Sequence, residues 1–321
     1  MALKMLNTLV DELSFGYKPE AATPTVAPTA AKPSVAVAKA AAAPQAKAAA
    51  AKAAAAPAPA PAPAASGEDL PATKALYQTD TYLFTCEASV LAVEELEGGK
   101  GWAVVLDETC FHPQGGGQPA DAGSVESTEG GAPFAVAMVR KGPTGVVRHE
   151  GPAGPPSFGV GAKVRCKVDE PARMLNSRVH TAGHLIDVAM TENGMAEKLR
   201  PTKGYHFLPG AYVEYDGKLE AKERDALVPK LQASMDSLVQ RAIGTVVQSV
   251  EGQKLDTACP PNALPADRSL WGTGWVRVVR VGGLGCPCGG THVANTSELK
   301  AVKVEAIKSK GKVTRVSYTV S

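Results

Sequence analysis

A cysteine and a histidine four positions apart flank a glycine turn near the end of the sequence, in the segment Cys288-Gly-Gly-Thr-His292. A second pair, His180 and His184, stands far upstream, and on an α-helix residues at i and i+4 lie on one face. Imidazole nitrogens and a thiolate sulfur are the donors that zinc binds in tetrahedral sites. The sequence therefore predicts a fold that brings these two distant segments together around one zinc ion per chain, with all four residues as ligands.

Two other interpretations of these residues remain open. In one, Cys288 is a small buried hydrophobic residue and the histidines are ordinary core or surface residues. In the other, Cys286, two positions earlier, replaces Cys288 as the ligand. Thr181 and His206 are neighbours of the predicted metal site, and the sequence does not identify the catalytic group.

Length and charge limit the class of protein. The chain has 321 residues, which suffices for about two ordinary domains. The formal net charge is only +2, so a nucleic-acid-binding surface would have to be a local patch. The six cysteines show no disulfide-type spacing and no secretory signal precedes them, so we expect reduced thiols and a cytoplasmic protein. No apolar run is long enough to span a membrane.

The first 72 residues have a composition unlike the rest. Residues 1–20 carry leucines at helical spacing and predict a short amphipathic helix. Such a helix is either marginal by itself or a docking element for a protein partner. An organellar transit peptide is a third interpretation, although the segment lacks arginine. Residues 21–72, rich in alanine, proline and lysine, predict a disordered, extended linker.

The remaining chain predicts an α+β protein with two parts. In residues 73–168, short β-rich segments alternate with glycine and proline turns, which is typical of a small β-barrel. In residues 169–321 we expect a long helix or a helix pair over residues 170–200, with Asp169 and Pro171 at its start, carrying the first histidine pair. Asn193-Gly194 would end a helical stretch. An amphipathic helix at 218–243 and strands at 212–215, 245–250, 275–281 and beyond 302 complete this part.

The histidine pair followed by Cys-Gly-Gly-Thr-His resembles the editing domain of alanyl-tRNA synthetase and its free-standing relatives, the AlaX proteins. The segment from Phe111 to Gly123, Phe-x-Pro-x-Gly-Gly-Gly-Gln-Pro-x-Asp-x-Gly, resembles the glycine-rich motif of the same editing region and of the longer AlaX proteins. The resemblance covers residues 75–321. It implies a barrel beside an editing pocket, and a zinc-containing editing domain in residues 169–321.

The resemblance also implies pocket residues. They are Gly116, Gly117, Gln118 and Asp121 of the glycine-rich motif, together with Thr202, which falls where the family keeps part of its amino-acid pocket. A turn-capping carboxylate is the alternative interpretation of Asp121.

The implied reaction is hydrolysis of the ester that joins serine, or glycine, to the terminal adenosine of the alanine tRNA. An activated ester needs little more than a positioned water and a polarised carbonyl. The partner would be the acceptor end of the tRNA, without ATP, since no nucleotide fingerprint is present. Candidate phosphate contacts are the basic residues Arg277, Arg280, Lys308, Lys310, Lys312 and Arg315, whose alternative is simple solvation.

Two other function classes remain open. One is a tRNA-binding or scaffold protein that has lost catalysis and keeps a structural zinc, since four protein ligands are typical of structural sites. The other is a different zinc hydrolase. A metalloprotease is disfavoured because no glutamate follows His180 to act as a base.

Overall fold

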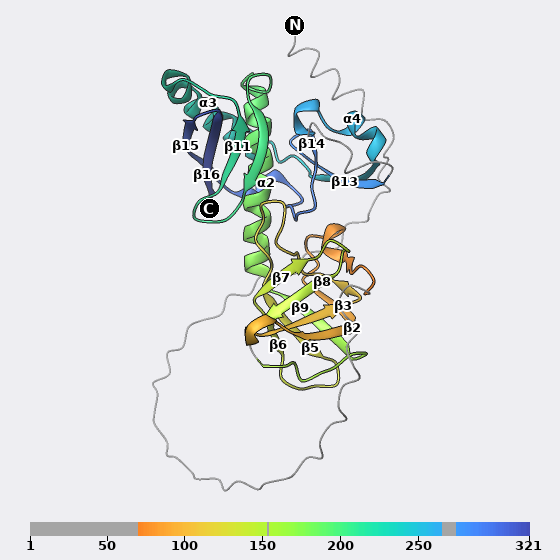
Figure 1. The fold of residues 1–321 in the computed structure, drawn as a ribbon. Helices are drawn as coiled ribbons and strands as arrows, with labels where there is room; N and C mark the ends of the chain where they lie inside the picture. The colour runs from red at the N-terminus through yellow and green to blue at the C-terminus, as the bar shows by residue number, and fades with distance from the viewer. Residues whose placement is uncertain (1–69, 153, 265–273) are drawn as a thin grey trace, which may run out of the picture. The chain divides into compact units, whose positions relative to one another are not determined.

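The computed structural model describes residues 70–152, 154–264 and 274–321 (Figure 1). The helix predicted for residues 1–20 lies outside this described part, and so does the predicted linker as far as residue 69. Within the described residues, no helix is both long and apolar enough to cross a membrane.

The first half of the described chain is one curved antiparallel sheet of seven strands, in the order β6-β5-β9-β2-β3-β8-β7. The longest strand, β2, pairs with β9 through its first residues and with β3 through its last, and a bulge near Val90 separates the two halves. The strands are β2 (Thr85–Glu95), β3 (Trp102–Leu106), β5 (Gly123–Ser127), β6 (Phe134–Val136), β7 (Met138–Lys141), β8 (Val147–Gly151) and β9 (Lys163–Val168).

The two edge strands of this sheet are neighbours in sequence. Only Ala137 separates β6 from β7, and its amide donates a hydrogen bond to the carbonyl oxygen of Glu150 in β8, at 2.8 Å. The sheet therefore curls until its edges meet, and the small barrel predicted for this part is confirmed as a nearly closed, barrel-like sheet. A short parallel pair, β1 (Lys74–Ala75) and β4 (Glu108–Thr109), precedes the glycine-rich segment.

Inward-facing residues alternate along the barrel strands, as in β9, where Val164, Cys166 and Val168 are buried and their neighbours are exposed. These residues join Val104, Leu106, Phe111, Phe134 and others in one apolar core. Three sulfur atoms, those of Cys86, Cys110 and Cys166, lie within 4.8 Å of one another beside this core.

The second half begins with the long helix α2 (Glu170–Glu192). The Asp169 side chain caps it by accepting a hydrogen bond from the amide of Ala172 at 3.1 Å, and a proline occupies the first turn. Asn193 ends the helix, and Gly194 follows in a left-handed conformation with φ of 73°. The predicted start and the Asn193-Gly194 end are confirmed, so α2 does not continue to residue 200.

Two small sheets and two further α-helices complete this half (Figure 1). One antiparallel sheet has the order β10-β11-β16-β15 and packs against α2 and α3; the other has the order β12-β13-β14. Their elements are β10 (Arg200–Tyr205), β11 (Tyr212–Asp216), α3 (Ala221–Gln240), β12 (Val246–Glu251), α4 (Leu255–Ala258), β13 (Trp275–Val281), β14 (Leu284–Pro287), β15 (Val302–Lys310) and β16 (Val313–Val320). Sequence patterns missed β10 and β14, because the first is largely polar and the second holds glycine and proline.

A buried ion pair joins the barrel to α2. The Arg173 guanidinium is fully buried, donates through Nε to both carboxylate oxygens of Asp121 at 3.0 Å, and contacts the same carboxylate through Nη2. Its remaining donors reach the carbonyl oxygens of Thr81 at 2.9 Å and Cys110 at 2.5 Å. The charges of Arg173 and Asp121 thus neutralise each other at this junction. The division of the chain into two domains at residue 168 stays a prediction.

We predict that Arg173→Met lowers the free energy of unfolding by about 3–5 kcal/mol, because it leaves the Asp121 carboxylate buried without a counter-charge. Urea unfolding of the two proteins measures the difference. Arg165→Met is the matched control, since Arg165 pairs with Glu87 on the exposed surface and should cost no more than about 1 kcal/mol. Equal losses from the two substitutions would show that the buried pair does not stabilise the junction.

Candidate metal centre and its pocket

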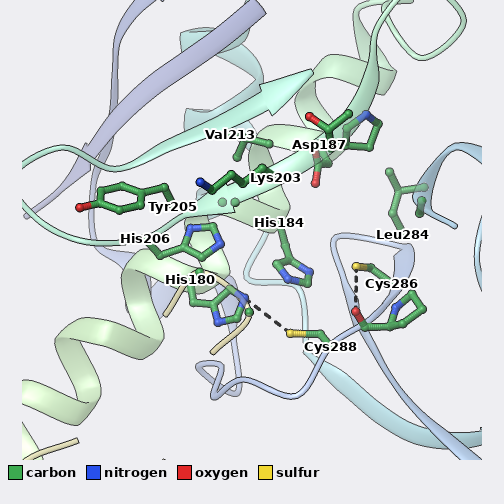
Figure 2. A pocket seen from close by; sticks show the side chains of 18 of the residues that line it. His180, His184, Asp187, Lys203, Tyr205, His206, Val213, Leu284, Cys286 and Cys288 are labelled. Carbon is green, nitrogen blue, oxygen red and sulfur yellow. Dashed lines mark hydrogen bonds between the residues drawn. The ribbon is translucent and has the colours of Figure 1, made fainter. Parts of the chain in front are cut away.

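The fold brings the four predicted ligands together. Figure 2 shows three of them, His180, His184 and Cys288. His180 and His184 project from α2, whereas Cys288 and His292 lie on the loop that follows β14. Their donor atoms all lie within 4.8 Å of one another. The Cys288 sulfur is 3.5 Å from Nε2 of His180 and 3.3 Å from Nε2 of His292.

Hydrogen bonds to Nδ1 of His180 and of His292 set the tautomers of these two imidazoles. Nδ1 of His180 lies 2.7 Å from Oε1 of Gln118, an atom that can only accept, so this nitrogen carries the proton. Nδ1 of His292 lies 3.1 Å from the hydroxyl of Thr181, which already donates to the carbonyl oxygen of Ser177 at 2.8 Å. Both Nε2 atoms are therefore free to bind a cation beside Cys288.

Gln118 also holds the loop that carries Cys288 and His292. Its Oε1 accepts a hydrogen bond from the amide of Thr291 at 3.0 Å, and its Nε2 donates to the hydroxyl of Thr291 at 2.8 Å. That hydroxyl in turn contacts the hydroxyl of Ser177 on α2, at 2.7 Å. One amide of the glycine-rich segment thus fixes a helix histidine and the ligand loop at once.

Two glycines are required by close packing of rings. A Cβ atom on Gly290 would lie 2.3 Å from Cε1 of His180, and one on Gly183 would lie 2.4 Å from Cε1 of His206. The glycine turn of the ligand loop and the glycine between the two helix histidines therefore make room for imidazoles.

Burial keeps the histidines neutral. It lowers the pKa of His184 to about 4, and it lowers the pKa of His180 and His292 well below the ordinary value. Burial also raises the pKa of the Cys288 thiol. The site therefore offers neutral imidazoles at pH 7 and a thiol that a bound cation would deprotonate.

The donor set fits zinc. Three nitrogens and one sulfur are typical zinc ligands, and bonds of about 2.0–2.3 Å are compatible with the sulfur–nitrogen separations seen here. The other group of donor atoms in the described chain, formed by Cys86, Cys110 and Cys166, belongs to the barrel. Cys286 lines the pocket, and its sulfur donates to the carbonyl oxygen of Pro287 at 3.4 Å.

A cavity of about 710 Å³ opens beside the metal centre. Residues 114–118 of the glycine-rich segment form one wall. The face of α2 with His180, His184 and Asp187 forms another (Figure 2), and β10, β11 and β14 also line the cavity. This size is typical of a pocket for a small molecule. Of the predicted pocket residues, Gly116, Gly117, Gln118 and Thr202 line the cavity. Asp121 does not; it forms the ion pair with Arg173.

His206 lies against the metal centre. Its ring stacks on that of His180, with centroids 4.4 Å apart. Its Nδ1 lies 2.7 Å from the hydroxyl of Tyr318, which donates to the carbonyl oxygen of Val179 at 3.0 Å, so Nδ1 is the protonated nitrogen. Burial lowers the pKa of His206 to about 3. The cavity wall therefore contains a neutral imidazole whose Nε2 is a hydrogen-bond acceptor.

Sequence reasoning overlooked Asp187 and Tyr215, which also line the cavity. The Tyr215 hydroxyl donates to Oδ1 of Asp187 at 2.6 Å. Burial raises the pKa of Asp187 to about 7. The signal was available, because Asp187 stands three residues after His184 and so extends the same face of the helix.

The predicted phosphate contacts fall into two groups. Arg277 faces inward: its guanidinium donates to the carbonyl oxygens of Gln78, Cys288 and Gly290, at 2.9, 2.6 and 3.0 Å, and so supports the ligand loop.

The other group lies further out. Arg280 makes long contacts of 3.4 Å to two carbonyl oxygens. Arg315 pairs with Glu214 at 2.8 Å. The lysines Lys308, Lys310 and Lys312 are exposed at the β15–β16 hairpin.

Two family models match the chain. The model of tRNA synthetases class II (A) matches residues 18–172, and that of the threonyl and alanyl tRNA synthetase second additional domain matches residues 276–315. The second match contains the ligand loop with Cys288 and His292.

Relatives align over most of the chain. The alanyl-tRNA editing protein AlaX-M of Methanosarcina mazei is 30% identical over 251 residues, which are 77% of this chain and 95% of the relative. AlaX-M of Methanosarcina barkeri is 32% identical over 252 residues, 77% of this chain and 98% of the relative. The alanine–tRNA ligase of Halobacterium salinarum is 29% identical over 243 residues, 74% of this chain but only 24% of the ligase. The chain therefore belongs to the family of AlaX-M alanyl-tRNA editing proteins.

Proposed function

We propose that this protein is a zinc-containing hydrolase that removes serine, and also glycine, from mischarged alanine tRNA. The observation that carries the proposal is the convergence of three imidazoles and a thiol, of which His180, His184 and Cys288 line a cavity that the glycine-rich segment helps to form. The relatives named alanyl-tRNA editing proteins support it. His180, His184, Cys288 and His292 would hold one zinc ion.

A bound zinc ion would supply a positive charge that polarises the ester carbonyl. The chain's own groups would do the rest. Gln118 holds His180 and Thr291 in place, and the backbone of Gly116 and Gly117 approaches the cavity without side chains. Nε2 of His206 can accept a hydrogen bond from the attacking water and so orient it. Positioning suffices because the aminoacyl ester is already activated.

The alternative is a scaffold that binds tRNA around a structural zinc ion. The cavity favours the hydrolase, because a structural site needs no space of about 710 Å³ beside its ligands.

Exposed Lys308, Lys310 and Lys312 would contact phosphates of the acceptor stem. A docking role for residues 1–20 and the cytoplasmic location stay predictions.

We predict that the purified full-length chain hydrolyses seryl-tRNA(Ala) much faster than alanyl-tRNA(Ala), since only serine offers a hydroxyl to pair with a polar group of the pocket. Glycyl-tRNA(Ala) should also be cleaved. Release of radiolabelled amino acid measures all three rates, with uncatalysed hydrolysis subtracted. Tight tRNA binding without release of any amino acid would favour the scaffold.

We predict that His184→Ala and Cys288→Ser each lose bound zinc and deacylation together. Metal analysis of the purified variants gives the number of zinc ions per chain. All variants also carry Cys86→Ser, so that the thiol group of the barrel does not contribute bound zinc to this number. Cys286→Ser is the matched control for metal content, because Cys286 is outside the ligand group. Zinc retained at one ion per chain in His184→Ala would refute the ligand assignment.

We predict that Gln118→Ala lowers zinc affinity about 10- to 100-fold, because His180 and the ligand loop lose the amide that orients them. Competition with a chromogenic chelator measures the affinity. Gln114→Ala is the matched control: Gln114 lines the same cavity, but its backbone amide, not its side chain, makes the hydrogen bond to Val139. Similar affinities for the two variants would assign no orienting role to Gln118.

A further inference from the structure

The cavity contains a carboxylate that the metal centre does not use. Asp187 lies on α2, three residues beyond His184, and lines the cavity (Figure 2). One of its oxygens accepts the hydrogen bond from Tyr215. Across the described residues it forms no ion pair, and the one lysine of the cavity lining, Lys203, is exposed to solvent. Among the described residues, Tyr215 is the side-chain donor to this carboxylate, so a ligand in the cavity can donate to the second oxygen.

The surroundings of this carboxylate are apolar. Met190 and Val213 are buried, and they line the cavity together with Leu284. A carboxylate in such a place is costly to ionise unless a cation or several donors compensate it. Burial raises the pKa of Asp187 for this reason, and a cation beside it would reverse that shift. The geometry calls for a ligand that brings a positive charge into the cavity.

We propose that Asp187 and Tyr215 form a subsite for the α-ammonium group of the aminoacyl ester. The proposal rests on the proposed function, because it assigns one end of the same substrate. Every aminoacyl-tRNA carries an ammonium group next to the ester carbonyl, and Asp187 lies one helical turn beyond the metal ligand His184. With the carbonyl at the metal centre, the ammonium group reaches the carboxylate, and Tyr215 fixes the carboxylate from behind.

The subsite has a consequence for substrate class. An acylated nitrogen carries no charge and adds bulk, so peptidyl-tRNA and other N-acylated esters would leave Asp187 uncompensated. The side chain of the amino acid plays no part in this selection. The subsite thus distinguishes free aminoacyl-tRNA from N-blocked tRNA, independently of the choice between serine and alanine.

The experiment compares seryl-tRNA(Ala) with its α-hydroxy analogue, in which a hydroxyl replaces the ammonium group. We expect the wild-type protein to prefer the seryl ester by about 10- to 100-fold in kcat/KM, the range of a charge-assisted hydrogen bond. Asp187→Asn should lose this factor on the seryl ester and leave the α-hydroxy analogue unchanged. Asp216→Asn, an exposed carboxylate on β11, is the matched control and should change neither rate.

Binding separates this proposal from the reaction itself. Adenosine analogues that carry serine or its α-hydroxy counterpart through a stable 3′-amide cannot be hydrolysed, and calorimetry gives their affinities. A preference for the ammonium analogue that disappears in Asp187→Asn supports the subsite even if no ester is cleaved, in which case the proposed function alone fails. Equal affinities of the wild-type protein for the two analogues would overturn the subsite. So would an equal loss of affinity for both analogues in Asp187→Asn.

Discussion

One side-chain amide connects the three segments on which the site depends. Gln118 comes from the glycine-rich segment, His180 from α2, and Thr291 from the ligand loop. All three are buried, so each hydrogen bond lacks a competing water and an unpaired partner would be costly. The imidazole tautomer, the path of the ligand loop and the position of the cavity wall follow from the same contact. The ion pair of Asp121 with Arg173 similarly connects the barrel to α2.

Much of this arrangement could be predicted from local patterns. The spacing of His180 and His184 requires only a helix, and the Asp169 cap, Pro171 and Asn193-Gly194 mark where that helix begins and ends. The Cys-Gly-Gly-Thr-His segment provides the complementary pair. The strand at 275–281 was predicted with the bounds that β13 has in the structure.

The remainder depends on tertiary contacts that no local pattern contains. Arg277 looks like a phosphate contact in sequence, yet its Nε and Nη1 donate to backbone carbonyl oxygens around the ligand loop. Asp121 belongs to a motif that suggests a pocket residue, yet the nearest cation is Arg173. The spacing of Asp187 from His184 predicts the helix face that it shares, but its contact with Tyr215 could not be predicted from that spacing. Its hydrogen-bond partner Tyr215 lies on β11, which is remote in the chain.

The cavity wall is made by both halves of the chain. Residues 114–118 come from the barrel, and α2, β10 and β14 come from the second half. Each half nevertheless has an apolar core of its own. A chain divided between β9 and α2 would therefore yield two fragments that can each collapse but that hold complementary portions of one site. Reassociation of such fragments, rather than the folding of either, would then determine whether a complete site exists.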